Sequence, residues 1–344
     1  MSGRPVTVAH ALVARLDGDG DVLLAGPAVR AVAAGADELT LLCGPSGRQA
    51  AALLPGVNHV LEWAAPWIQA EPGPVRAPEV DRLVMAVRGA GITAAVVLTS
   101  FHQSALPLAL LLRLAGVGRI TAISEDYPGS LLDVRHHVPE LIPEPERALS
   151  VAAAAGFPAP PGDDGRLRVR GPLPDVDHLV GPGAYVVVHP GATVPARACP
   201  PALAAEVVRM LTGQGRHVVV TGGPAERPLT AQTAGTDGTD LGGRTTFAEL
   251  AAVLAGADAV VVGNTGPAHL AAAVGTPVVS LFAPTVPYEK WRPYGVAAVR
   301  LGDQQAACRG TRARVCPVPG HPCLASVTAV EVAGAVAELE GVPA

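Results

Sequence analysis

The first candidate site in the sequence is a turn rich in aspartate and glycine, Asp17-Gly-Asp-Gly-Asp21, which follows Arg15. An EF-hand calcium loop would need Gly at its sixth position and Glu at its twelfth, and Val22 and Ala28 stand there instead. A site in which two of the carboxylates bind one cation stays open, because a glycine-rich turn can fold them onto the same ion.

The three aspartates of this turn have different predicted roles. Asp17 and Asp19 are interpreted as solvated acids of the turn. Asp21 either caps the following helix and favours its dipole, an effect worth about 0.5–2 kcal/mol, or acts as a general base. A carboxylate that accepts a proton from a substrate hydroxyl contributes roughly 10²–10⁴ in rate. We favour the second role, because Asp21 lies in a strand-to-helix turn that points into the cleft expected between two domains.

The second candidate site follows an apolar run that ends at His189. The turn Pro190-Gly-Ala-Thr193 leads toward a helix near Pro201, and Arg197 lies four residues beyond Thr193. A guanidinium there can bind a phosphate through two parallel hydrogen bonds. A surface arginine on a loop is the alternative. His189 is interpreted as a hydrogen-bonded histidine at a strand end rather than as a base.

The third candidate site is the most specific pattern in the chain. An apolar run leads into Gly263-Asn-Thr-Gly266, and a helix then begins with Pro267 near its first position. The free N–H groups around Thr265 and Gly266, together with the Thr265 hydroxyl, predict an anion site at a helix N-terminus. Gly266 lets a phosphate approach closely, and His269 faces the same opening. The alternative is an ordinary capped helix with His269 packed in the fold.

The elements that must hold these residues alternate between short apolar strands and longer amphipathic helices, which indicates right-handed βαβ units and mostly parallel sheets. From about 124 to 183 the pattern loosens into a segment rich in Pro, Gly and Asp, interpreted as a linker. The whole pattern therefore predicts two doubly wound α/β units joined by this linker, with a cleft between them. The expected strands are 7–13, 38–43, 60–62, 94–98, 119–123, 185–189, 217–221, 259–262 and 278–281. The expected helices are 21–34, 48–54, 80–90, 104–115, 201–212, 247–255, 267–274 and 329–339.

The composition narrows the class of protein. The chain has 344 residues, of which 49% are apolar, and a net charge of −5. That apolar content excludes a largely disordered chain, and the mild acidity disfavours binding to nucleic acid. Lys290 is the one lysine, so a phosphate-binding loop ending in Gly-Lys-Ser/Thr is excluded.

No apolar stretch reaches the roughly 18–20 residues of a membrane span, and no signal peptide is apparent. We therefore expect a cytoplasmic protein without a transmembrane segment.

Three of the five cysteines fall close together: Cys308, Cys316 and Cys323, with His321 between the last two. Three thiols and an imidazole would suffice for a tetrahedral zinc site. The spacing differs from that of the common zinc motifs, which favours buried free thiols or one disulfide. A structural zinc site stays the alternative.

Together, the three candidate sites resemble the lipopolysaccharide heptosyltransferase family, glycosyltransferase family 9. The resemblance covers most of the chain and is weakest from about 124 to 183. It is carried by three segments of this sequence: Arg15-Leu-Asp-x-x-Gly-Asp-Val-Leu-Leu24, His189-Pro-Gly-Ala-Thr193 and Asn264-Thr-Gly-Pro-Ala-His-Leu-Ala-Ala-Ala-x-Gly-Thr-Pro277.

The resemblance implies a GT-B architecture, in which two Rossmann-like domains face a central cleft. An acceptor domain would span 1–175 and a donor domain 184–326, with a C-terminal helix in 327–344 packing back on the first domain. The implied activity is an inverting transfer of heptose or a similar sugar from a nucleotide-diphosphate donor, such as ADP-heptose, to an acceptor hydroxyl. The acceptor would be a glycan, a lipid-linked molecule or a small molecule. A lipid-linked acceptor would place the protein at the inner face of the membrane.

The resemblance also implies roles for individual residues. Asp21 lies where the family has its catalytic aspartate, and Arg197 falls where many members have a lysine that contacts phosphate. Glu226, which follows another strand, matches a carboxylate that binds ribose. The implied donor-binding residues are Thr193, Arg197, Glu226, Asn264, Thr265, Gly266 and His269.

Two departures from the family pattern bear on chemistry. Asn264 stands where the family usually has Asp, and this neutral amide removes a metal ligand while reducing repulsion near a diphosphate. We therefore expect no required cofactor, with Mg²⁺ as the alternative. Cys199 replaces a Trp that usually follows the basic residue of the second site.

Two other functions stay open at this point. One is another sugar-nucleotide enzyme of the same architecture, such as an epimerase, although the paired acidic residues that its reaction needs are not evident. The other is a sugar-nucleotide binding protein without catalysis. Asn264 keeps this second alternative open, and the intact Gly20-Asp21 turn argues against it.

Overall fold

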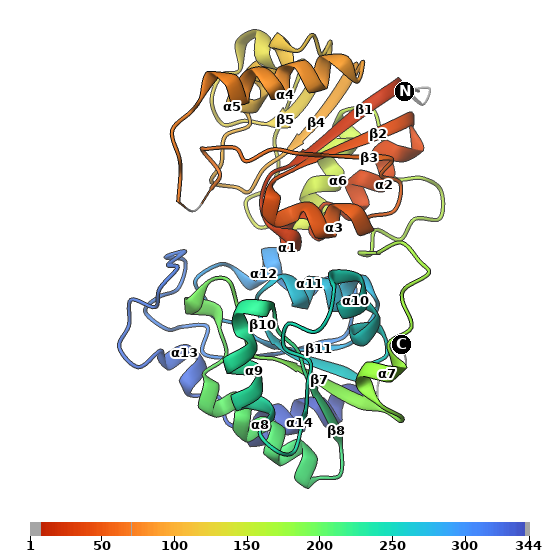
Figure 1. The fold of residues 1–344 in the computed structure, drawn as a ribbon. Helices are drawn as coiled ribbons and strands as arrows, with labels where there is room; N and C mark the ends of the chain where they lie inside the picture. Colours follow the sequence, from red (N-terminus) through yellow and green to blue (C-terminus); the bar gives the residue numbers. More distant parts are fainter. Residues whose placement is uncertain (1–7, 70, 341–344) are drawn as a thin grey trace. The chain divides into compact units, whose positions relative to one another are not determined.

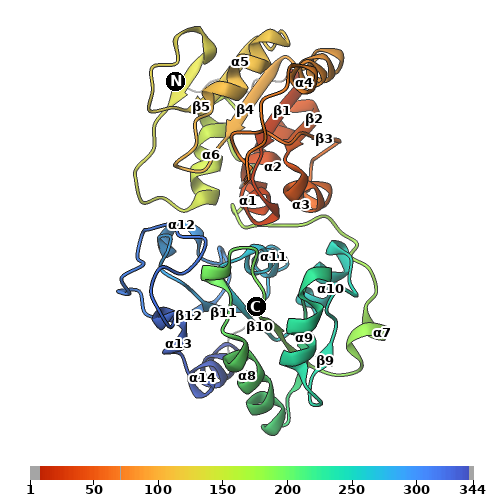
Figure 2. The same cartoon turned by 60° about the vertical axis from the view of Figure 1, so that its left-hand side comes forward.

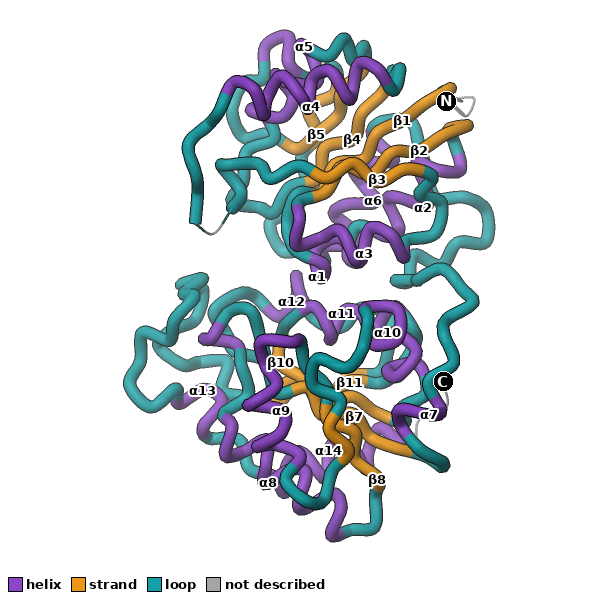
Figure 3. Tube along the Cα trace, viewed as in Figure 1, coloured by secondary structure: helices purple, strands orange, loops and turns teal. Residues whose placement is uncertain are grey.

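The computed structural model describes residues 8–69 and 71–340, and their strands form two six-stranded parallel sheets (Figures 1 and 3). The chain divides into two compact units between Val169 and Arg170. In unit 1 the strands are β1 (Val8–Arg15), β2 (Ala36–Cys43), β3 (His59–Glu62), β4 (Ala94–Leu98), β5 (Arg119–Ile123) and β6 (Val134–His136). In unit 2 they are β7 (Tyr185–His189), β8 (His217–Val220), β9 (Thr239–Asp240), β10 (Ala259–Gly263), β11 (Val278–Leu281) and β12 (Ala298–Leu301).

Both sheets have the same topology. The strand orders are β3-β2-β1-β4-β5-β6 in unit 1 and β12-β11-β10-β7-β8-β9 in unit 2. Numbered from the first strand of each unit, both read 3-2-1-4-5-6, the order of a doubly wound Rossmann fold. The expected α/β class with two Rossmann-like units is therefore confirmed.

Helices cover both faces of the sheet in unit 1. Figure 1 shows α2 and α6 together on one face and α4 and α5 on the other. Because both faces are covered, strands such as β4 are buried along their whole length and carry continuous apolar runs. The helices are α1 (Asp19–Leu24), α2 (Gly26–Ala34), α3 (Arg48–Leu53), α4 (Ala77–Gly89), α5 (Leu106–Leu114) and α6 (Glu144–Ala154).

Unit 2 repeats this layering. Helices α8 and α14 lie side by side on one face of the sheet (Figures 1 and 2), and α10 packs against α11. The helices are α7 (Asp177–Val180), α8 (Pro201–Gly213), α9 (Arg227–Ala234), α10 (Phe247–Ala255), α11 (Gly266–Ala273), α12 (Tyr288–Trp291), α13 (Pro322–Ala325) and α14 (Ala329–Glu340). Within the described ranges, none of the helices combines the length and the apolarity needed to cross a bilayer.

Two sequence predictions in unit 1 are wrong. The helix expected over 21–34 is two helices, α1 and α2, and α2 restarts at Gly26 with Pro27 near its first position. Proline has no N–H to continue the preceding helix, whereas this loss is harmless in a new first turn. The linker expected from 124 contains β6 and α6, both of which belong to unit 1.

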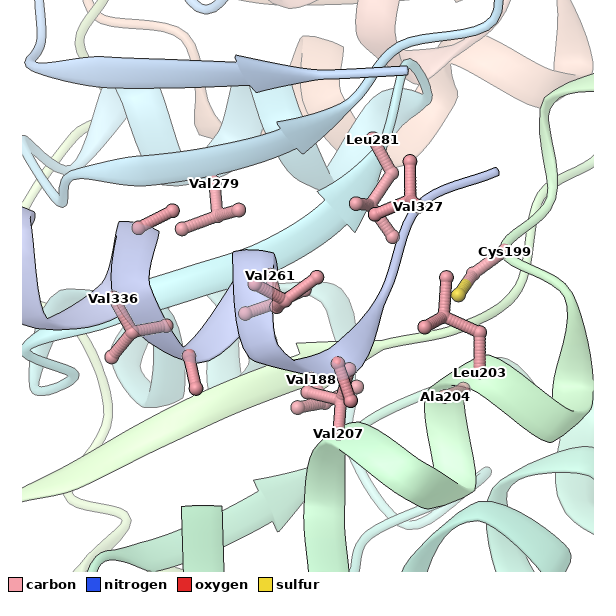
Figure 4. Packing of buried hydrophobic residues seen from close by; sticks show 14 of the residues in the cluster. Val188, Cys199, Leu203, Ala204, Val207, Val261, Val279, Leu281, Val327 and Val336 are labelled. Carbon is pink, nitrogen blue, oxygen red and sulfur yellow. The ribbon is translucent and has the colours of Figure 1, made fainter. Parts of the chain in front are cut away.

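The prediction that the C-terminal helix returns to the first domain is also wrong. Within the described residues, α14 packs in the core of unit 2, against α8 and strands β10, β11 and β12. Val332, Val336 and Leu339 recur at helical spacing and are buried, and Val336 belongs to the same core cluster as the sheet residues Val261 and Val279 (Figure 4). Burying each such side chain contributes about 1.5–3 kcal/mol, so the helix stays on its own sheet. Residues 341–344 of the expected segment lie outside the described part.

Candidate functional site

The candidate residues lie at the same topological position in both units. The strand order reverses between β1 and β4 in unit 1, and between β7 and β10 in unit 2. In open α/β sheets, ligands bind beyond the carboxyl ends of the strands at this reversal. Arg15 ends β1, His189 ends β7 and Gly263 ends β10, so the predicted sites follow strands at these two positions.

In unit 1 the centre of the site is the buried side chain of Arg15, which is 3% exposed. Its Nη2 donates hydrogen bonds to Asp21 Oδ1 at 2.7 Å and to Ser100 Oγ at 2.9 Å. Its Nε lies 2.9 Å from Asp17 Oδ2, and its Nη1 lies 3.5 Å from Glu144 Oε2. Burial alone would lower the pKa of Arg15, but the three carboxylates outweigh burial and raise the pKa above its ordinary value.

Asp21 does not cap the helix, so the capping part of that alternative is wrong, although an acid in the first turn still favours the helix dipole. Helix α1 begins at Asp19 after Gly18, and no side chain caps it. Asp21 lies in the first helical turn instead, where its carboxylate accepts the hydrogen bond from Arg15. Its side chain remains 29% exposed. The carboxylate is therefore fixed in orientation and still accessible to a ligand.

The prediction that Asp17 and Asp19 are solvated is also wrong. Asp17 is 13% exposed and accepts a hydrogen bond from Gln103 Nε2 at 2.5 Å. Burial raises the pKa of Asp17 although Arg15 lowers it. Asp19 Oδ1 accepts the N–H of Ala50 at 2.9 Å, and burial raises the pKa of Asp19 to about 6. Both acids connect the turn to neighbouring elements. Of the three aspartates of this turn, Asp21 is therefore the one accessible to a ligand.

Sequence reasoning missed two buried charged residues of this site, Glu144 and Arg147 on α6. The Glu144 side chain is 2% exposed, and its Oε2 lies 3.7 Å from Arg147 Nη1. Arg147 also donates to the carbonyl of Thr99, just beyond β4. A helix-start signal was present in the sequence, because Pro145 stands between two glutamates ahead of apolar residues.

In unit 2 the centre of the site is the N-terminus of α11. Thr265 precedes the helix with an extended backbone, and its hydroxyl makes no capping hydrogen bond. Thr265 and Gly266 are both half-buried, and Pro267 contributes no N–H. The Gly266 N–H and the Thr265 hydroxyl are thus arranged where an anion would bind a helix N-terminus.

Two buried polar side chains flank this N-terminus. Asn264 is 4% exposed and His269 is 5% exposed. Among the described residues, Oδ1 and Nδ2 of Asn264 and Nδ1 of His269 have no hydrogen-bond partner. Burial, and then the positive charge of Arg197, lower the pKa of His269 to about 4, so its imidazole is neutral at pH 7. Each unpartnered group costs about 1–3 kcal/mol in the absence of a ligand.

The loop that carries Arg197 packs directly against the end of β10. Arg197 lies in a 3₁₀ turn, Pro195–Arg197, and a Cβ added at Gly263 would overlap the carbonyl oxygen of Arg197. Glycine is therefore required at position 263 for this close approach. The structure brings Arg197, Asn264 and His269 together at α11, whereas the exposed Thr193 lies earlier in the same loop. The ligand roles of these residues stay predictions.

Glu226 lies on the neighbouring strand-to-helix loop. Its Oε2 accepts the N–H of Gly223 at 2.7 Å and lies 3.9 Å from His189 Nε2. Its carboxyl packs against Gly191, where a Cβ would overlap it. His189 Nδ1 lies 2.9 Å from the hydroxyl of Thr221, and burial lowers the pKa of His189. The interpretation of His189 as a hydrogen-bonded strand-end histidine is confirmed.

Cys308 and Cys316 lie in the loop after β12, and Cys323 lies in α13. Within 8–69 and 71–340, no group of three or more His, Cys, Asp or Glu side chains is arranged to hold a metal ion. Cys308 and Cys323 are buried free thiols, and burial, with the neighbouring Cys308, raises the pKa of Cys323 to about 12. His321 Nε2 lies 3.1 Å from the carbonyl of Ala196 instead. These residues hold the loop after β12 to unit 2.

The fold over almost the whole chain is that of solved heptosyltransferase structures. The structure of ADP-heptose lps heptosyltransferase II from E. coli superposes with a TM-score of 0.74 at 19% identity, covering 96% of this chain and 98% of that one. A glycosyl transferase family 9 protein from Veillonella parvula gives a TM-score of 0.79 at 14% identity, covering 98% and 99%. The expected GT-B fold class is therefore confirmed.

Sequence similarity identifies the family. Residues 82–320 match the family described as glycosyltransferase family 9 (heptosyltransferase), and the chain belongs to this family. Lipopolysaccharide heptosyltransferase 3 of Escherichia coli is 34% identical over 126 residues, which are 35% of this chain and 37% of that protein. Lipopolysaccharide heptosyltransferase 1 of Pseudomonas aeruginosa is 37% identical over 157 residues, 44% of this chain and 42% of that protein. This chain thus aligns with less than half of either relative.

Proposed function

We propose that this protein is an inverting glycosyltransferase that moves heptose or a similar sugar from a nucleotide-diphosphate donor, such as ADP-heptose, to an acceptor hydroxyl. In this proposal unit 2 binds the donor and unit 1 supplies the base. The family and the names of the two relatives support transfer of heptose, and the E. coli structure named as an ADP-heptose heptosyltransferase suggests the donor. The acceptor would be a glycan, a small molecule or a lipid-linked molecule, and the last would bring the protein to the inner face of the membrane.

The observation that carries the proposal is the α11 N-terminus with its unpartnered polar neighbours. A diphosphate leaving group gains negative charge as its bond to the anomeric carbon breaks. The Gly266 N–H, the Thr265 hydroxyl and the Arg197 guanidinium would stabilise that charge. Because Asn264 and His269 have unpartnered polar atoms among the described residues, a bound donor would recover the hydrogen bonds they lack.

Asp21 would take the proton from the acceptor hydroxyl. As the acceptor oxygen forms its bond to the anomeric carbon, the bond to the diphosphate oxygen breaks, and the hydroxyl proton passes to the Asp21 carboxylate. A single displacement of this kind inverts the anomeric configuration. Arg15 orients the carboxylate at 2.7 Å, and its 29% exposed side chain is open to an acceptor.

Glu226 and Thr193 complete the proposed donor site. The Glu226 carboxylate is 27% exposed, and beyond its bond to Gly223 it retains acceptor capacity for the ribose hydroxyls of a nucleotide. Thr193 is exposed in the loop before Arg197, where its hydroxyl can reach a phosphate. Neutral Asn264 places no carboxylate beside the diphosphate, so we propose transfer without a required metal ion.

Binding and transfer can be tested separately. Thermal shifts with ADP, UDP and GDP identify the base, and incubation with sugar nucleotides of that base and a panel of acceptors identifies transfer by mass spectrometry. We expect the largest shift with ADP and a product of inverted anomeric configuration, read by NMR. Conversion of the sugar nucleotide into its epimer, with no sugar transferred to an acceptor, would favour the epimerase alternative. Binding without any turnover would favour a protein that only binds sugar nucleotides, and absence of both would contradict the proposal.

A further inference from the structure

We propose that Arg15 is a positioning residue for Asp21, and that Glu144 of α6 positions Arg15 in turn. This inference rests on the proposed role of Asp21 as the base. The chain of contacts runs from Arg147 to Glu144 at 3.7 Å, from Glu144 to Arg15 at 3.5 Å, and from Arg15 to Asp21 at 2.7 Å. Residues from two segments far apart in the sequence thus set the orientation of one carboxylate.

The solvent exposure of the side chains increases along this chain of contacts, from Glu144 to Asp21. The side chains of Glu144 and Arg15 are 2% and 3% exposed, and that of Asp21 is 29% exposed. Only the Asp21 end can therefore meet a substrate. The buried members would act through Asp21 rather than touch the reacting atoms.

The geometry at Arg15 requires a guanidinium. Its Nη2 donates hydrogen bonds to Asp21 and Ser100, while its Nε and Nη1 lie 2.9 and 3.5 Å from carboxylate oxygens of Asp17 and Glu144. A planar guanidinium offers five N–H groups in a fixed fork, whereas a lysine ammonium is a single point charge on a flexible stem. Lysine at position 15 would keep the charge and lose the simultaneous contacts. Asp21 would then sample other rotamers.

Stability alone does not account for this cluster. Moving a charged pair out of water costs several kcal/mol per ion, and apolar side chains of similar volume are often as stabilising. The structure contains such an ion pair with no contact to Asp21: Arg30 donates to Asp163 at 2.7 and 2.8 Å, also in unit 1. The side chains of Arg15 and Arg30 are 3% and 10% exposed within their ion pairs, but only Arg15 holds an exposed carboxylate at the strand reversal. The Arg30 pair therefore serves as a matched structural control.

The experiment compares Arg15→Lys, Glu144→Gln and Arg30→Lys in the full-length protein with the donor and acceptor identified above. We expect Arg15→Lys to lower kcat by about 10- to 100-fold, the loss typical when a group that orients a functional side chain is removed. Donor KM should change by less than roughly 2-fold, because the donor is held by unit 2. Glu144→Gln should give a smaller loss of the same kind. Arg30→Lys should lower the thermal midpoint and leave kcat unchanged.

A double-mutant cycle tests whether Arg15 acts through Asp21. In the Asp21→Asn background, Arg15→Lys should change the residual kcat by less than about 2-fold, because the carboxylate to be positioned is already absent. Equal losses in both backgrounds, or a loss no greater than that of Arg30→Lys, would overturn the positioning role while the proposed function stands. An active Asp21→Asn variant, or a wild type that transfers no sugar, would overturn the proposed function itself.

Discussion

The two strand reversals of this protein have the same topology and differ in how their buried polar side chains are paired. In unit 1 every charged side chain around Arg15 has an opposite charge at 2.7–3.7 Å. In unit 2 the polar atoms of Asn264 and His269 lie buried without a hydrogen-bond partner among the described residues. In the first site the charged groups are thus paired by ions of opposite sign, although Arg15 Nε and Asp17 Oδ2 make no hydrogen bond among the described residues, whereas in the second site a neutral amide and a neutral imidazole lie buried without such partners. This contrast is what we expect of a preorganised base and of a site that binds a polar ligand.

The largest expected effect is at Asp21. Asp21→Asn should lower kcat by about 10²–10⁴, the usual worth of a general base, while the thermal shift with nucleotide stays at the wild-type value. Asp19→Asn is the matched control in the same helix, because an amide oxygen can still accept the Ala50 N–H. Equal losses from both substitutions would assign Asp21 a structural role and remove the contrast between the units.

The second effect is at Arg197. Arg197→Met should lower kcat by about 10²–10³, since losing one donor to a developing negative charge costs about 2.7–4 kcal/mol. Arg216→Met, which removes an arginine paired with Glu340 in the same unit, should leave kcat unchanged. The comparison is made by steady-state kinetics at saturating acceptor. An undiminished rate for Arg197→Met would place the diphosphate elsewhere.

The third effect is a pH dependence of stability. Because the pKa of His269 is about 4 in the folded protein and 6.5 ordinarily, the unfolded chain binds the proton first as the pH falls. The His269 imidazole should therefore lower the free energy of unfolding progressively as the pH falls from 6.5 to about 4, by a total of about 3 kcal/mol. The neutral variant His269→Gln should lack this component, measured as the difference in unfolding free energy between the two proteins across that range. Parallel pH curves for both proteins would show that the imidazole is not held neutral.

The smallest effect is at Asn264, and it separates binding from stability. Asn264→Ala should leave the thermal midpoint unchanged or raise it, because two unpartnered polar atoms disappear, and should weaken donor binding by roughly 5- to 100-fold. Ser280→Ala is the control, since the Ser280 hydroxyl is also buried and unpartnered among the described residues but lies within β11. Removing the Ser280 hydroxyl should raise the thermal midpoint without changing the affinity for the donor. Calorimetric titration with the donor nucleotide measures binding, and a calorimetric thermal scan measures the midpoint; a loss of stability in Asn264→Ala would contradict a ligand-binding role.

Local patterns in the sequence predicted the central elements well. Strands 94–98, 119–123, 185–189 and 278–281 and helix 247–255 are found with the expected bounds, because each is a distinct apolar segment bounded by turn or loop residues. Elements with weak patterns were missed, among them β12 and α6. Their formation depends on pairing and packing with segments distant in the sequence.

The same division holds at the candidate sites. The motif around Asn264 and Thr265 predicted a helix N-terminus correctly, because the helix start at Pro267 is a local property of the chain. The roles of Asp17 and Asp19 could not be predicted, because their partners, Gln103 and Ala50, lie 30 or more positions away in the sequence.

The sequence by itself determined the alternation of strands and helices, the family and the glycine-rich turns, since each depends on residues close together in the chain. The tertiary structure decided which charges meet. It buried Arg15 against a glutamate from α6, kept the last helix on the sheet of unit 2, and left Asn264 and His269 without partners in the described residues. The physical reason is that burial and ion pairing are properties of a folded neighbourhood, and residues far apart in the sequence supply it.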